Sequence, residues 1–162
     1  MAYSLFQNVL VLVNGSEAAM KAVWYGVILS KACKCNLKAL YVVDTATLKQ
    51  LTLNKFFVEE ESLDYEKSLK NDGAKYLQYA EEIGKSKGIR IETELRSSSV
   101  WGETVATADQ MNSDLILLGG FQKDTGEIHA AATMSYHEIM KNAHCSILMV
   151  RNENIEKLYK QV

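Results

Sequence analysis

The chain has 162 residues, of which 48% are hydrophobic and 23% charged, and its formal net charge is −2. This size and composition are typical of one globular domain. The slightly acidic balance excludes the basic surface needed to bind nucleic acid or an anionic membrane, and no apolar run approaches the roughly 20 residues that span a bilayer. Because the three cysteines are an odd number and no charged leader precedes the first apolar segment, we expect a reduced, cytoplasmic protein.

The first half of the chain predicts two buried strands. Residues 8–13 (NVLVLV) are apolar at every position after Asn8, as in a parallel strand that is covered on both faces. Asn14 or Ser16 can cap the helix that follows, in which Trp24 belongs to an apolar stripe at helical spacing. Residues 37–43 predict the second strand. Residues 45–58 show no clear periodicity, and we predict a loop there.

The second half continues the alternation of helices and strands. A long helix is predicted for residues 59–87, because its acidic start suits a helix N-terminus and Gly88 can end it. Trp101 is placed in a loop near the predicted binding edge. The further elements are a strand at 89–95, a helix at 104–111, a strand at 114–118, a helix at 133–142, a strand at 147–150 and a short helix at 154–160.

Strands that alternate with helices predict an α/β fold with a parallel sheet and helices on both faces. In a doubly wound sheet of order 3-2-1-4-5, the first and fourth strands are neighbours at the switch point. Ligands bind beyond the carboxyl ends of such strands. The predicted binding edge therefore consists of Val13, Asn14, Leu118, Gly119 and Gly120.

Four segments together resemble the universal stress protein (UspA-like) family: VLVLVNGSEAAMKAV, LKALYVVD, VWGETVATADQMNSDLILLGG and SILMVRN. Their order and spacing cover residues 7–151. The resemblance implies one domain over residues 1–162, with an adenine nucleotide alpha hydrolase-like fold and a C-terminal extension at 152–162. It also implies a homodimer formed through the fifth strand, Ile147, Leu148, Met149 and Val150.

ATP-binding members of that family carry G-x2-G-x9-G-(S/T) after the fourth strand and an Asp after the first. Counted from Gly119, this chain has Gln122 and Ala132 at the second and third glycine positions, then Thr133, and Asn14 replaces the Asp. Counting back from the fifth strand shifts the later positions by one residue and restores neither glycine. Val42 matches a position of the family's adenine pocket.

These replacements predict weak or no binding of ATP. Glycine allows the left-handed conformation and lets backbone N–H groups approach a phosphate, whereas a Cβ in that conformation costs about 1–2 kcal/mol per residue. Two such positions would weaken binding by about 100-fold if the affinity carries the whole cost. Asn14 keeps an acceptor oxygen but loses the charge that strengthens hydrogen bonds to a ribose.

We therefore expect a regulatory binding protein of the stress response that acts as a homodimer. The alternative is a switch protein with ATP or AMP, together with Mg, as its cofactor. Its hydrolysis of the nucleotide would be slow or absent. A third class, a redox or metal protein, would use the cysteines, but the Cys33-x-Cys35 spacing is a weak metal signal. No nucleophile–base pair is readable, so we expect no catalytic residue and no metal site.

Overall fold

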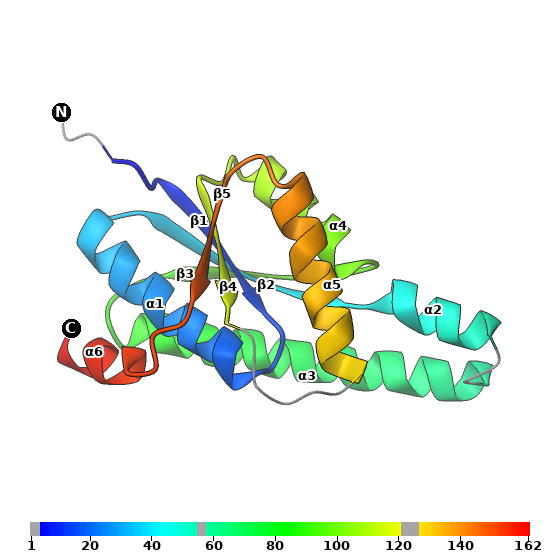
Figure 1. Ribbon diagram of the computed structural model, residues 1–162. Helices are drawn as coiled ribbons and strands as arrows, with labels where there is room; N and C mark the ends of the chain where they lie inside the picture. The colour runs from blue at the N-terminus through cyan, green and yellow to red at the C-terminus, as the bar shows by residue number, and fades with distance from the viewer. Residues whose placement is uncertain (1–3, 55–57, 121–126) are drawn as a thin grey trace.

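The computed structural model describes residues 4–54, 58–120 and 127–162, except for the side chains of 127–133. Figure 1 shows how the helices and strands are arranged. In chain order they are β1 (Asn8–Val13), α1 (Glu17–Cys33), β2 (Asn36–Val43), α2 (Thr45–Leu53), α3 (Glu59–Lys85), β3 (Ile91–Ser97), α4 (Val100–Gln110), β4 (Leu115–Gly119), α5 (Glu127–Asn142), β5 (Ser146–Val150) and α6 (Ile155–Gln161).

The five strands form one parallel sheet of order β3-β2-β1-β4-β5, which confirms the predicted fold class. The register places Val11 of β1 beside Leu117 of β4, so the carboxyl ends of these two strands lie at the same edge. Val9 to Val13 are at most 1% exposed. Such complete burial explains why the β1 segment is apolar at every position and not only at alternate ones.

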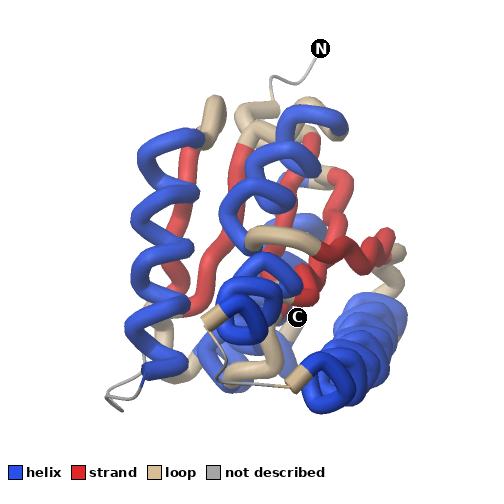
Figure 2. The backbone as a smooth tube through the Cα atoms, turned by 90° about the vertical axis from the view of Figure 1, so that its right-hand side faces the viewer, coloured by secondary structure: helices blue, strands red, loops and turns tan. Residues whose placement is uncertain are grey.

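Helices cover both faces of the sheet, as Figure 2 shows from the side. On one face α1 and α3 pack over the strands, and α6 packs against α1. On the other face α4 and α5 lie over a second apolar cluster that includes Leu12, Val42 and Leu118. Within the described part of the chain, no helix has the length and apolarity required to cross a membrane.

The loop predicted for residues 45–58 is wrong over most of its length, because α2 occupies Thr45–Leu53. Asp44, which directly follows β2, is the N-cap of α2: its Oδ1 accepts a hydrogen bond from the Thr47 amide at 3.0 Å. Leu48 is the only residue of α2 that is buried. With one buried position, this helix has no repeating apolar stripe that a sequence pattern could reveal. It lies beside the N-terminal part of α3 (Figure 1).

The fourth helix begins earlier than predicted, at Val100. Ser99 caps it, since its Oγ accepts a hydrogen bond from the Gly102 amide at 3.2 Å. Trp101 therefore lies in the first turn of α4 and not in a loop, with 37% of its surface exposed. The predicted placement of Trp101 in a loop is therefore wrong, because the cap at Ser99 starts the helix earlier than residue 104.

Candidate functional site

The predicted binding edge brings together the ends of β1 and β4, as their register requires. Val13 is 1% exposed and Leu118 is fully buried. Neither side chain can therefore meet a ligand, and these two residues can offer only backbone groups. Asn14 directly follows β1 and is exposed at this edge.

The amide side chain of Asn14 is engaged at both ends. Its Oδ1 accepts hydrogen bonds from the Ser16 amide at 3.0 Å and from the Ser16 hydroxyl at 2.6 Å. Its Nδ2 donates to the hydroxyl of Tyr136 at 3.4 Å. Ser16 in turn caps α1, because its Oγ accepts from the Ala19 amide. Asn14 thus connects the end of β1 with the start of α1 and with α5.

Tyr136 is a part of this edge that the sequence interpretation missed. It lies on α5, is 4% exposed, and shares the apolar cluster that holds Val42. Burial raises the pKa of the Tyr136 hydroxyl, and the hydrogen bond from Asn14 opposes that rise. A neutral tyrosine therefore extends from the second core cluster to the end of β1. In the sequence it resembles an ordinary core residue at helical spacing from Ile139.

Val42, the predicted adenine-pocket residue, is 8% exposed and lies in the cluster with Tyr136. It follows Leu40 by one alternation of β2 and therefore points to the same face of the sheet. The structure thus places Val42 on the side of the sheet where Asn14 meets Tyr136. These three residues share one face, although their positions in the sequence are far apart.

The two glycines at the end of β4 are held tightly. An added Cβ at Gly119 would lie 2.5 Å from the carbonyl carbon of Ala18, in the first turn of α1. The Gly120 amide donates to the Val150 carbonyl at 2.9 Å. Among the described glycines, only Gly15 and Gly88 have a positive φ. Gly119 is therefore required by the close approach of β4 to α1 and not by a left-handed turn.

The remaining glycine-loop positions divide into two groups. Gln122 lies outside the described residues. Ala132 and Thr133 lie inside α5, which begins at Glu127, so the predicted helix start at residue 133 is wrong. The start is earlier because residues 130–132 are three alanines, the strongest helix formers. A helical backbone has negative φ, so the left-handed penalty does not apply to Ala132.

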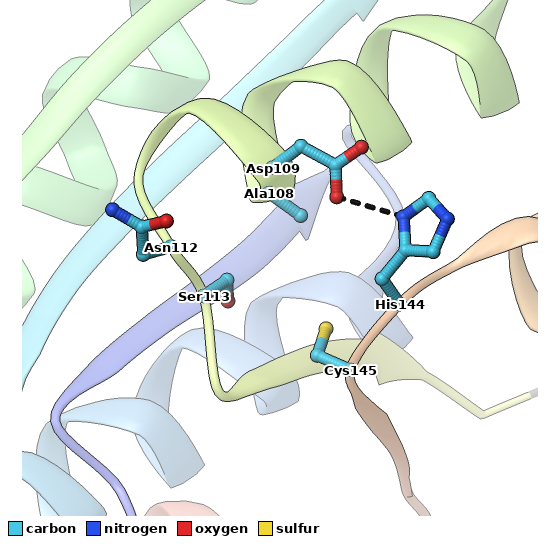
Figure 3. A pocket seen from close by; sticks show the side chains of 6 residues that line it. All are labelled: Ala108, Asp109, Asn112, Ser113, His144 and Cys145. Atoms are coloured by element: carbon cyan, nitrogen blue, oxygen red, sulfur yellow. Dashed lines mark hydrogen bonds and ion pairs between the residues drawn. The ribbon is translucent and has the colours of Figure 1, made fainter.

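A separate cavity of 260 Å³ lies at the opposite end of the sheet (Figure 3). His144 Nδ1 and Asp109 Oδ1 are 3.0 Å apart there, and Cys145 lies beside them. Burial raises the pKa of the Cys145 thiol, so the thiolate that a nucleophile requires is disfavoured. The described cysteines form no disulfide, and the described His, Cys, Asp and Glu side chains form no metal-binding group of three.

Comparison with known proteins identifies the chain's family. The model of the universal stress protein family matches residues 5–151. The chain belongs to this family. Two relatives carry the family's name. Universal stress protein MJ0531 of Methanocaldococcus jannaschii is 25% identical over 153 residues, which are 94% of this chain and 86% of that protein. Universal stress protein YxiE of Bacillus subtilis is 26% identical over 149 residues, 91% of this chain and all of that protein.

Solved structures of universal stress proteins share the fold. A family member from Burkholderia pseudomallei has a TM-score of 0.70 at 18% identity. The similarity covers 93% of this chain and 100% of that one. A universal stress protein in complex with cAMP has a TM-score of 0.55 at 16% identity, with coverages of 90% and 97%. An Archaeoglobus fulgidus member in complex with dAMP has a TM-score of 0.59 at 11% identity, with coverages of 91% and 99%. This universal stress protein therefore has the predicted adenine nucleotide alpha hydrolase-like fold.

Proposed function

We propose that this universal stress protein is a regulatory binding protein of the stress response, located in the cytoplasm, that binds ATP weakly or not at all. The observation that supports this proposal best is the engagement of Asn14 by Ser16 and Tyr136. In ATP-binding members of the family an Asp stands at this position and contacts the nucleotide. Here the same position holds parts of the protein together.

The cost of releasing Asn14 sets the expected loss of affinity. A nucleotide at this edge would have to compete for Oδ1 with two donors from Ser16. It would also take the Asn14 amide away from the nearly buried hydroxyl of Tyr136. The loss of one such hydrogen bond costs about 0.5–1.5 kcal/mol, which corresponds to a loss of about 2- to 13-fold in affinity. A neutral amide also accepts hydrogen bonds less strongly than a carboxylate.

An adenine-nucleotide switch is the second candidate function. It is favoured by the similarity to family structures in complex with cAMP and with dAMP. This chain retains Gly119, Gly120 and Val42 at the corresponding edge. Such a protein would bind AMP, or ATP together with Mg, and would act through binding and release of the nucleotide. Hydrolysis would be slow or absent, because no nucleophile–base pair is found among the described residues near this edge.

Calorimetric titration of the purified protein with Mg-ATP and with AMP tests the proposal. We expect a dissociation constant for ATP well above micromolar, and a submicromolar value would refute the weak-binding proposal. Nucleotide that co-purifies with the protein, seen by native mass spectrometry, would favour the switch.

Two variants separate the contributions of the predicted binding residues. Asn14→Asp with Gln122→Gly is expected to improve ATP binding, since the pair restores the charge and removes a Cβ from the loop. Adding Ala132→Gly should give no further gain, because Ala132 lies inside α5 and a helical glycine costs about 1 kcal/mol. If the triple variant alone bound ATP, Ala132 would belong to the binding loop.

We also propose that the protein is a homodimer that pairs through β5. This strand ends the sheet and is hydrogen-bonded to β4 on one side within the described structure. Ile147, Leu148 and Met149 are only partly buried, and an apolar edge strand favours pairing with another strand. Light scattering should give the mass of a dimer. Ile147→Lys is expected to produce a monomer, whereas Leu158→Lys on α6 should not. A monomeric wild type would contradict the proposal.

A further inference from the structure

A groove of 500 Å³ lies between the first half of α1 and the middle of α3. It is on the face of the sheet that carries α1 and α3, whereas Asn14 meets Tyr136 on the opposite face. Its volume is within the range of about 300–1,000 Å³ that is usual for small-molecule sites. Met20 and Trp24 of α1 form one side, and Tyr76 and Tyr79 of α3 form the other.

The aromatic walls of this groove are supported from behind. The ring of Tyr76 stacks on Tyr41, with centroids 6.3 Å apart and 16° between the planes. It also packs against Gly15, where an added Cβ would lie 2.7 Å from Tyr76 Cε2. Trp24 is half-buried and contacts the ring of Tyr159, 6.4 Å away. Both rings are therefore held in place while they line the groove, and a preorganised wall loses little side-chain entropy on binding.

The charge at the rim indicates the kind of ligand. Lys75 lines the groove, and among the described residues it has no ion-pair partner. Glu17 also lines the groove, but it lies in the first turn of α1, where the positive end of the helix dipole opposes its charge. Neither charge has an ion-pair partner among the described residues, and the Lys75 ammonium is the one that can pair with an anionic group.

We propose that this groove binds a planar aromatic small molecule that carries one anionic group. Its ring system lies between Trp24 and Tyr79, because flat rings pack well on offset aromatic faces. Its anionic group pairs with Lys75 at the rim. The groove adjoins the binding edge, because Ser16 lines it and donates hydrogen bonds to Asn14. The residues that carry the proposal, Trp24, Lys75 and Tyr79, belong to α1 and α3 and are not among the predicted nucleotide-binding residues.

Two fluorescent probes test this site without knowledge of the natural ligand. 8-Anilinonaphthalene-1-sulfonate carries a flat naphthalene ring and one anionic group, and N-phenyl-1-naphthylamine has the same ring system without the sulfonate. The chain has two tryptophans, so Trp101→Phe leaves Trp24 as the sole tryptophan donor. We expect one saturable site per chain, with energy transfer from Trp24 to the bound probe. Binding at several equivalent sites, or binding without transfer from Trp24, would overturn the proposal.

Substitutions then separate the ring contact from the charge contact. Lys75→Gln should weaken binding of the anionic probe by about five- to tenfold and leave the neutral probe unchanged, as expected for one charge-assisted contact. Tyr79→Ala should weaken both probes by about tenfold, as for loss of a stacking surface. Leu63→Ala, at an exposed leucine elsewhere on α3, is the control and should change neither affinity.

Three results would refute the proposal. If Lys75→Gln weakened the binding of both probes equally, Lys75 would not pair with the anionic group. A loss in Leu63→Ala as large as that in Tyr79→Ala would mean that the probes bind exposed apolar residues in general. Probe affinity that rises when the protein is diluted would mean that a second copy of the chain covers the groove.

Discussion

Gly119, at the end of β4, lies against Ala18, in the first turn of α1, so closely that a Cβ on Gly119 would be 2.5 Å from the Ala18 carbonyl carbon. The neighbouring atoms, Ala18 O and Ala19 N, are also backbone atoms, each 2.6 Å from that position. Backbone in a helix cannot move aside as a flexible side chain can. Gly119, which the sequence predicts as the first glycine of a phosphate loop, thus has a structural role in this chain.

Gly119→Ala is expected to destabilise the protein by about 3 kcal/mol, at the upper end of the cost of overpacking. Urea unfolding followed by circular dichroism measures the change. Gly26→Ala is the matched control: the three atoms nearest to its Cβ would be side-chain atoms of Leu37 and Leu117, at 3.1 to 3.2 Å, and the gain in helix propensity of about 1 kcal/mol offsets that contact. Equal losses in the two variants would contradict this account.

Tyr136→Phe should change both the stability and its dependence on pH. Near pH 7 the variant loses the hydrogen bond from Asn14, at a cost of about 1 kcal/mol. Because burial raises the pKa of Tyr136 in the folded protein, its neutral form contributes stability that is complete below about pH 10 and declines as the pH rises from there toward the raised pKa.

Urea unfolding at pH 8 and pH 10.5 measures that dependence. We expect the wild type to lose more stability between these two pH values than Tyr136→Phe does. Tyr41→Phe provides a comparison, because burial also raises the pKa of Tyr41. Identical pH slopes for wild type and Tyr136→Phe would contradict this account, because they would mean that folding does not raise the pKa of Tyr136.

Tyr159 holds α6 against the body of the protein. Its hydroxyl donates to the Ile83 carbonyl at 2.8 Å and lies 2.8 Å from the Ser86 hydroxyl, while Lys87 Nζ lies 5.0 Å from the ring centroid. Tyr159→Phe keeps the ring and should raise hydrogen exchange in α6 moderately. Tyr159→Ala should raise it strongly and leave β1 protected. Leu158→Ala, at an exposed position, is the control. Equal exchange in Tyr159→Ala and Leu158→Ala would contradict the role of Tyr159.

The fold was predictable because its central strands are apolar at successive positions. Residues 9–13 and 115–118 are apolar at successive positions, as strands covered on both faces require. α2 gave no such signal, since Leu48 alone is buried and Asp44 serves both the preceding strand and the helix. Local patterns predict an element when several of its residues share one environment.

The binding edge was only partly predictable. The positions of Asn14 and Gly119 follow from strand order alone. The hydrogen bond from Asn14 to Tyr136 joins residues 122 positions apart, and no local pattern can report such a contact. The early start of α5 was missed because the family motif was expected to continue as a loop through Ala132, although the alanines of residues 130–132 favour a helix.

The contact of Gly15 with Tyr76 leads to a prediction with a matched control. Gly15 and Gly88 both have positive φ, at 81° and 73°, so Gly15→Ala and Gly88→Ala should each lose about 1 kcal/mol to backbone strain. An added Cβ at Gly88 has no atom within 4 Å, whereas at Gly15 it would lie 2.7 Å from the Tyr76 ring. Gly15→Ala should therefore cost about 1 kcal/mol more than Gly88→Ala, the lower end for overpacking, since the end of a side chain can shift. In a double-mutant cycle measured by urea unfolding, Tyr76→Ala should remove this difference. If the extra cost persisted without the ring, it would arise from the loop backbone between Asn14 and Ser16.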